Sequence, residues 1–217
     1  MRAYDVVLFD LDGTLTEPFE GITNSVAYAL EKFGIRVKDR RELTPFIGPP
    51  LVDAFSEYYG FSRDDALKAV EYYRENYSVK GIYEASLYDG VPEMLEGCRR
   101  AGLTVAVATA KPEEFALKVL EKFGILKYFD LVAGASFDTS RKDKDKVIAY
   151  ALERLGGADK SRTVMVGDRK HDAEGAAANG IKCIGVTYGY GSGEELLSSG
   201  AAGLASSPRE VLSLITG

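Results

Sequence analysis

Residues 6–16 read VVLFDLDGTLT, and this stretch decides the fold class of the chain. Its first four residues form a short apolar run, which is typical of a buried strand in a parallel sheet. Asp10 and Asp12 follow, and in an open α/β sheet ligands bind just beyond the carboxyl ends of the strands. Gly13 allows the positive φ of a sharp turn, and Thr14 adds a hydroxyl. The stretch therefore predicts two carboxylates at a ligand-binding edge, although Asp also caps helices and turns.

The composition describes a globular chain with an excess of acidic residues. It has 217 residues, of which 46% are hydrophobic, so it can bury a full-sized core as one large domain or as one domain with an insertion. The formal net charge is -6, and the sequence contains no long basic stripe. We therefore expect neither nucleic acid nor a membrane as a partner. A small anionic substrate fits this charge if basic groups gather at one site.

Targeting and cysteine patterns predict a cytoplasmic protein. The N-terminal residues MRAYD do not lead into a long apolar stretch, and no run approaches the ~18 apolar residues of a membrane helix. Cys98 and Cys183 are isolated, the first in a helical pattern and the second in a strand pattern, so they indicate no disulfide or zinc framework. We expect both thiols to be small core residues.

From residue 89 onward, helical and strand patterns alternate. Such alternation predicts a parallel sheet with helices on both faces. The expected strands cover residues 104–108, 131–133, 163–166 and 182–186, with a weaker one at 203–205. The expected helices cover residues 91–100, 112–123, 145–155 and 172–179, with another from residue 208.

About seventy residues separate the first strand from this alternating region. Their pattern predicts helices at 19–33, at 51–59 and from 62 to about 80. A crossover between parallel strands needs only a dozen or so residues, so an inserted domain is the simplest interpretation. We expect residues 1–15 and 87–217 to form an α/β core. Residues 16–86 are expected to form a helical cap over the strand ends.

Polar residues follow three of the expected core strands. Asp10 and Asp12 follow the first, residues 109–111 (TAK) follow the second, and residues 167–172 (GDRKHD) follow the strand at 163–166. A basic run, residues 141–146 (RKDKDK), precedes the helix between the last two. Parallel strands bring all such ends to one edge of the sheet, so we expect these groups to lie together.

With these motifs the sequence resembles the haloacid dehalogenase superfamily of phosphohydrolases. The resemblance rests on residues 10–14 (DLDGT), Thr109, a lysine near position 144 and residues 167–172. It spans nearly the whole chain, and the helical insertion lies where that family carries its cap. It implies a Rossmann-like, doubly wound parallel sheet with an inserted all-helical cap. It also implies Mg²⁺-dependent hydrolysis of a small-molecule phosphate monoester, as in phosphoglycolate phosphatases and their relatives, which include pyrophosphatases and nucleotide 5′-phosphatases.

The resemblance also implies a role for each matching residue. Asp10 is the implied nucleophile, which forms an aspartyl-phosphate, and Asp12 is the implied acid and base. A carboxylate and a phosphate at ~3.5 Å repel by about 5 kcal/mol at an effective dielectric of ~20, so the reaction needs positive charge. Mg²⁺ would supply it. The implied metal ligands are Asp10, the backbone carbonyl of Asp12, Asp168 and Asp172, and the implied phosphate-binding groups are Thr109, the N–H of Ala110 and Lys144.

Several alternatives stay open. Lys144 lies three residues before Val147, which begins the apolar face of a helix, and Lys142 is the second candidate for the lysine. Asp172 is expected to bind the metal directly, to lie behind its ligands or to cap a helix. His171 is a candidate acid or base, but the implied mechanism already gives that role to Asp12. The segment at 46–51 (FIGPPL) is the expected specificity loop.

Two other functions are alternatives to a phosphatase. A sugar phosphomutase would return the phosphoryl group to its substrate, so it would need a bisphosphate activator. A phospho-acceptor signalling module also places Asp, Thr and Lys at strand ends, but such a module is shorter and lacks an insertion after its first strand. The sequence makes no prediction of the oligomeric state.

Overall fold

The computed structural model describes residues 3–138 and 140–217, and the chain divides into two compact units. The core unit consists of Met1–Glu17 with Leu87–Gly217, and the helical unit consists of Pro18–Ser86. The first division falls after Glu17, whereas the sequence placed it after residue 15. Two short strands, β2 (Thr16–Glu17) and β3 (Ser86–Leu87), pair where these divisions fall.

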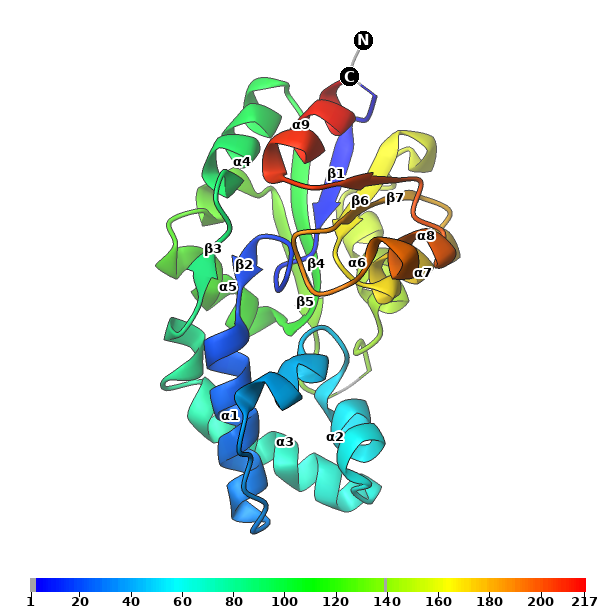
Figure 1. The fold of residues 1–217 in the computed structure, drawn as a ribbon. Helices are drawn as coiled ribbons and strands as arrows, with labels where there is room; N and C mark the ends of the chain where they lie inside the picture. Colours follow the sequence, from blue (N-terminus) through cyan, green and yellow to red (C-terminus); the bar gives the residue numbers. More distant parts are fainter. Residues whose placement is uncertain (1–2, 139) are drawn as a thin grey trace. The chain divides into compact units, whose positions relative to one another are not determined.

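The core unit is built on a six-stranded parallel sheet with the order β5-β4-β1-β6-β7-β8 (Figure 1). In its middle, Phe9 of β1 pairs with Val107 of β4 on one side and with Val166 of β6 on the other. The carboxyl ends of these three strands therefore lie side by side. The predicted Rossmann-like α/β fold is confirmed. The strands are β1 Val6–Phe9, β4 Thr104–Pro112, β5 Leu131–Ala135, β6 Thr163–Gly167, β7 Lys182–Val186 and β8 Gly203–Ala205.

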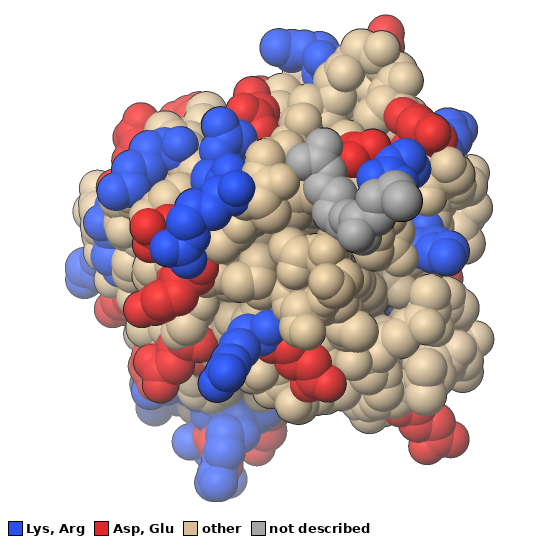
Figure 2. Space-filling model, turned by 90° about the horizontal axis from the view of Figure 1, so that it is seen from above, with Lys and Arg blue, Asp and Glu red and all other residues tan. Residues whose placement is uncertain are grey.

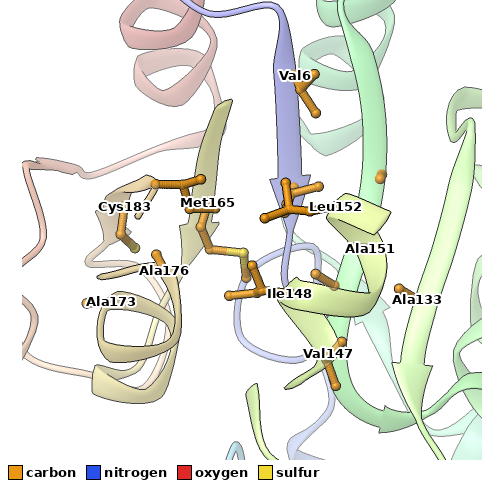
Figure 3. Packing of buried hydrophobic residues seen from close by; sticks show 14 residues of the cluster. Val6, Ala133, Val147, Ile148, Ala151, Leu152, Met165, Ala173, Ala176 and Cys183 are labelled. Carbon is orange, nitrogen blue, oxygen red and sulfur yellow. The ribbon is translucent and has the colours of Figure 1, made fainter. Parts of the chain in front are cut away.

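Helices cover both faces of this sheet. Val147 and Ile148 of α6 pack with Val6 and Leu8 of β1 in the buried cluster that Figure 3 shows. Because side chains alternate along a strand, the fully buried Val7 faces the opposite side. The helices of the core unit are α4 Val91–Arg100, α5 Glu113–Lys122, α6 Lys144–Arg154, α7 Lys170–Ala178, α8 Gly193–Ser198 and α9 Pro208–Thr216, with 3-10 turns η3 Leu126–Tyr128 and η4 Lys160–Arg162.

β4 is longer than the sequence predicted. The prediction ended it at residue 108, but the strand continues to Pro112, with a shift of register against β5 between Thr109 and Pro112. A Cβ atom at Gly134 of β5 would lie 2.4 Å from the Cα of Glu113, so only glycine lets the two segments approach this closely. The prediction that a helix includes Pro112 was therefore wrong, and residues 109–111 extend a strand instead of forming a loop.

The helical unit contains the three predicted helices and two 3-10 turns that were not predicted. A Cβ atom at Gly21 of the first helix would lie 2.1 Å from the carbonyl oxygen of Gly81, so this packing requires glycine. Aromatic rings fill the unit, and Phe55 stacks on Phe61 with centroids 5.8 Å apart. The elements are α1 Phe19–Lys32, η1 Arg40–Phe46, α2 Leu51–Tyr59, α3 Arg63–Tyr77 and η2 Gly81–Tyr83.

The surface and the buried thiols agree with the composition. Figure 2 shows acidic side chains interspersed with basic ones on the face seen from above. Cys98 and Cys183 are both buried, as predicted. Among the residues that the structure describes, none of the helices is long and apolar enough to cross a membrane.

Candidate active site

The turn after β1 begins the site. The backbone N–H of Asp10 donates to the carbonyl of Val166 at 2.9 Å, which ties the start of the turn to β6. The amides of Leu15 and Thr16 both donate to the carbonyl of Leu11 at 2.9 Å, so the turn is closed by its own backbone. Gly13 has a φ of 84°, and it permits the positive φ that the sequence predicted for this turn.

Three carboxylates meet at the edge of the sheet. Asp10, Asp168 and Asp172, called the carboxylate cluster below, are all buried and offer side-chain oxygens within 4.8 Å of one another. They come from the ends of β1 and β6 and from the first turn of α7. The space around them is tight, since a Cβ atom at Gly13 would lie 2.2 Å from Oδ2 of Asp168. The motifs that the sequence singled out at these two strand ends are therefore in contact.

Asp172 has two structural roles at once. Its Oδ2 accepts a hydrogen bond from the backbone N–H of Arg169 at 3.1 Å, so Asp172 caps α7. Its Oδ1 lies 2.8 Å from the Nζ of Lys144. The sequence predicted a helix that starts at residue 172. The helix begins at Lys170 instead, which places Asp172 inside the first turn. The cap that the sequence left open for Asp172 is therefore compatible with a place in the carboxylate cluster.

Lys144 contacts two members of this cluster. Its Nζ lies 2.7 Å from Oδ1 of Asp10 and 2.8 Å from Oδ1 of Asp172, and it donates to the carbonyl of Ala108 at 3.1 Å. Lys144 is the first residue of α6, so the start of this helix delivers the charge to the strand ends. Lys142, the other candidate, has its Nζ 3.9 Å from Asp143 and a side chain that is 37% exposed. Of the two, the structure brings Lys144 to the cluster.

Asp12 pairs with a lysine that the sequence-based assignment missed. The Nζ of Lys111 lies 2.7 Å from Oδ2 of Asp12, and the lysine side chain is only 4% exposed. Thr16 donates from Oγ1 to the other oxygen, Oδ1 of Asp12, at 3.3 Å. One signal was in the sequence, because Lys111 lies two residues after Thr109, and alternate residues of a strand face the same way. A longer β4 would have revealed it.

The predicted phosphate-binding residues of β4 lie on this continuation of the strand. Thr109 is buried, and its hydroxyl oxygen accepts a hydrogen bond from the backbone N–H of Lys111 at 3.3 Å. That bond leaves the hydroxyl proton of Thr109 available to donate. Ala110 is half-buried and lies between them. His171 lies next to Glu174 of its own helix, at 3.8 Å, and burial lowers the pKa of this histidine.

Negative charge is in excess at the site. The carboxylate cluster and Asp12 supply four acidic groups, and Lys111 and Lys144 supply two basic ones. Burial, followed by repulsion from the other two members of the cluster, raises the pKa of Asp168 well above its ordinary value. Burial raises the pKa of Asp172 to about 6 although Lys144 opposes this. Burial likewise raises the pKa of Asp12, against the effect of Lys111.

These properties fit a divalent cation. Oδ1 of Asp10 and Oδ1 of Asp172 are both buried, and they share the ammonium of Lys144 at 2.7 and 2.8 Å. Several buried carboxylates that share one ammonium are costly unless further positive charge is added. Hard cations such as Mg²⁺ prefer carboxylate oxygens as ligands. The residues of the cluster can therefore hold a metal ion.

A glycine-rich loop after β7 packs against the same turn. The backbone N–H of Tyr190 donates to Oδ2 of Asp168 at 2.8 Å, and the hydroxyl of Tyr188 donates to the carbonyl of Thr14 at 3.0 Å. A Cβ atom at Gly189 would lie 2.3 Å from the carbonyl oxygen of Gly13, so a side chain is excluded there. The sequence-based assignment did not include this loop. The spacing of glycines just after a predicted strand was its only signal.

The chain is similar to known hydrolases over most of its length. The model of the haloacid dehalogenase-like hydrolase family matches residues 7–186. A 5′-nucleotidase from Pseudomonas aeruginosa is 46% identical over 89% of this chain and 87% of its own length. The tyrosine-protein kinase PtkA from Mycobacterium tuberculosis is 43% identical over 86% of this chain and 63% of its own. A phosphoglycolate phosphatase from Vibrio parahaemolyticus is 29% identical over 97% and 95%.

The solved structures agree with these relatives. A crystal structure described as a predicted phosphatase from Clostridium acetobutylicum superimposes with a TM-score of 0.94 at 44% identity and covers 97% of both chains. The family model and the relatives confirm the resemblance predicted from the sequence. The chain belongs to the haloacid dehalogenase-like hydrolase family, and within it to the hydrolases of phosphate esters.

Proposed function

We propose that this protein hydrolyses a small-molecule phosphate monoester in two steps, through an aspartyl-phosphate on Asp10, with Mg²⁺ as its cofactor. One observation carries the proposal. Asp10 is a member of the carboxylate cluster and at the same time lies 2.7 Å from the Nζ of Lys144. It is therefore next to the charge that an incoming phosphate needs.

In the first step, a side-chain oxygen of Asp10 attacks phosphorus and the bond from phosphorus to the leaving oxygen breaks. Asp12 gives its proton to that oxygen, so the leaving group departs as an alcohol. In the second step, a water molecule attacks the aspartyl-phosphate and gives a proton to the Asp12 carboxylate. Inorganic phosphate leaves, and Asp10 and Asp12 return to their starting states.

The surrounding residues handle the charge of the phosphate. Asp10, Asp168 and the backbone carbonyl of Asp12 would hold Mg²⁺, with Asp172 as a further ligand or as their support. The ion would supply positive charge between the nucleophile and the phosphate dianion. The ammonium of Lys144 adds charge on the side of Asp10. The hydroxyl of Thr109 donates to a phosphate oxygen as negative charge develops on it, together with the N–H of Ala110.

The raised pKa of Asp12 supports its role as the acid. Burial favours the protonated form of this carboxyl, and the proton is needed for the first step. The same group is deprotonated once the leaving group has departed, which is the form that accepts a proton from water. The surroundings of Asp12 are therefore suited to one proton transfer in each direction.

Similarity favours a nucleoside 5′-monophosphate as the substrate. The relative with the name 5′-nucleotidase is 46% identical to this chain, against 29% for the phosphoglycolate phosphatase. The sequence alone had placed phosphoglycolate first, with nucleotides and pyrophosphate as alternatives. We propose further that the helical unit is the cap that selects the substrate and that residues 46–51 form its specificity loop.

A phosphate-release screen tests the proposed function. The purified protein is assayed with Mg²⁺ on nucleoside monophosphates, phosphoglycolate, pyrophosphate and sugar phosphates, and with ATP plus a tyrosine peptide because one relative is named a kinase. Phosphate release from a monoester that is lost in Asp10→Asn is the expected result. Activation by a sugar bisphosphate with little free phosphate would indicate a phosphomutase instead. Transfer of phosphate to the peptide would indicate a kinase.

A further inference from the structure

We propose that Lys111 is a positioning residue: it holds the carboxyl group of Asp12 in the orientation in which the protonated form gives its proton to the leaving oxygen. The inference rests on the proposed function, because it needs Asp12 to act as the acid. It adds a residue from outside the motifs that identify the family in this sequence.

Lys111 and Lys144 contact different carboxylates. The Nζ of Lys111 lies 2.7 Å from Oδ2 of Asp12, whereas Lys144 contacts Asp10 and Asp172. Each lysine therefore contacts its own part of the site. Lys144 serves the side where the phosphate is attacked, and Lys111 serves the side where the leaving group departs.

Both oxygens of Asp12 are held. Lys111 binds Oδ2, and the hydroxyl of Thr16 shares its proton between Oδ1 at 3.3 Å and the carbonyl oxygen of Leu11 at 3.2 Å. Thr16 is fully buried, and the side chain of Lys111 is 4% exposed, so neither group is free to exchange its partner for bulk water. Fixing the orientation of an acid in this way increases the rate of the chemical step, because proton transfer requires a short and aligned approach.

The fold explains how Lys111 reaches this position. β4 is the neighbour of β1 in the sheet and continues to Pro112, past the point at which β1 ends after Phe9. Burial alternates along this continuation, with Thr109 and Lys111 buried and Ala110 half-buried. A lysine buried at a strand continuation needs an anionic partner, and Asp12 is the partner that it contacts. The same segment also orients Thr109, whose hydroxyl accepts from the N–H of Lys111.

The test compares two substrates that differ mainly in the basicity of the leaving group, phenyl phosphate and p-nitrophenyl phosphate. Phenolate is the stronger base and gains more from protonation by Asp12. In Lys111→Met, which keeps the length and removes the charge, kcat/KM for phenyl phosphate should fall at least about tenfold more than kcat/KM for p-nitrophenyl phosphate. A loss by the same factor for both substrates would overturn the proposal, since misfolding or a general structural role lowers both equally. No loss for either substrate would also overturn it.

A second variant and a matched control complete the experiment. Thr16→Val removes the other contact to Asp12. Like Lys111→Met, it should lower kcat/KM for phenyl phosphate more than kcat/KM for p-nitrophenyl phosphate. Lys118→Met is the control, because Lys118 is an exposed lysine of α5 that pairs with Glu114 on its own helix. It should leave both values of kcat/KM unchanged.

The double variant distinguishes positioning from a direct effect of Lys111 on the leaving group. If Lys111 acts through Asp12, adding Lys111→Met to Asp12→Asn changes the ratio of the two kcat/KM values no further. A further change would show that Lys111 acts on the leaving group itself, and it would overturn the positioning role. The proposed function is judged separately by the wild type. If the wild type releases no phosphate from either substrate or from any monoester in the screen, the proposed function fails, whereas Lys111→Met tests the inference alone.

Discussion

Two lysine–carboxylate contacts at the same edge of the sheet have different surroundings. Lys144 lies between two members of a cluster that has more carboxylates than cations, whereas Lys111 is paired with Asp12. The first arrangement has an excess of carboxylates, as the proposed metal site requires. The second pairs one carboxyl with one ammonium, and this carboxyl is the proposed acid and base. The same two residue types therefore support different chemistry, and the number of neighbouring carboxylates sets the difference.

The largest effects should separate the two aspartates. Asp10→Asn removes the proposed nucleophile and should lower kcat by about 10⁴-fold or more. Asp12→Asn keeps the nucleophile and should lower kcat by about 10²- to 10⁴-fold for a substrate with a basic leaving group. Phosphate release gives both values, and circular dichroism checks that each variant is folded. A folded Asp10→Asn enzyme with more activity than Asp12→Asn would reverse the assigned roles.

Removal of metal should abolish phosphate release without unfolding the protein. Excess chelator should stop phosphate release, and Mg²⁺ should restore it. Saturating Mg²⁺ should also raise the melting temperature, since a ligand at 100 times its Kd adds about 2.7 kcal/mol of stability. In Asp168→Asn this rise should be lost. Full activity in chelator, or an unchanged rise in Asp168→Asn, would contradict a metal site at these residues.

The third effect distinguishes the two candidate lysines. Lys144→Met leaves buried carboxylates without their cation and should cost about 3–5 kcal/mol in unfolding free energy without metal. It should also lower kcat by about 10²- to 10³-fold. The half-exposed Lys142 is the matched control, and Lys142→Met should change the unfolding free energy by less than about 0.5 kcal/mol. Urea unfolding measures the free energy of both variants. Equal losses of unfolding free energy would contradict the choice of Lys144 over Lys142.

The smallest effect is the pH dependence of stability in the metal-free protein. Burial raises the pKa of Asp172 from 3.8 to about 6, so the folded protein binds this proton more tightly than the unfolded chain does. The unfolding free energy should therefore fall as pH rises through this interval. Melting curves in chelator should show the fall, and Asp172→Asn should make it shallower. A rise in stability over the same interval would mean that Lys144 outweighs the burial of this carboxyl.

Local patterns predicted much of the fold and most of the motifs that meet at the site. The apolar run and turn at residues 6–16 depend on neighbouring residues, so the sequence alone was enough to place them. Lys144 was predictable for the same reason, because the apolar face that begins at Val147 locates the start of its helix. The roles of these residues, the cap and the cytoplasmic location stay predictions.

Lys111 was expected at this edge of the sheet as part of residues 109–111, but its pairing with Asp12 was not predicted, because that pairing depends on residues distant in the sequence. β4 continues past residue 108 since Gly134, on the neighbouring strand, lets the segment around Glu113 approach. No periodicity within residues 104–112 reports that contact. α8, Gly193–Ser198, was missed for a different reason, because a helix of six residues is too short to establish a helical period.

The close approach of the loop after β7 has a consequence for protein engineering. A Cβ atom at Gly189 or Gly191 would overlap backbone atoms of Gly13 and Asp168, so a randomised library of this loop should return glycine at both positions among active clones. A designer who grafts only the aspartate turn into another parallel sheet would omit the segment that packs against it. The transplantable unit is the turn together with the loop, although the loop carries no reacting group.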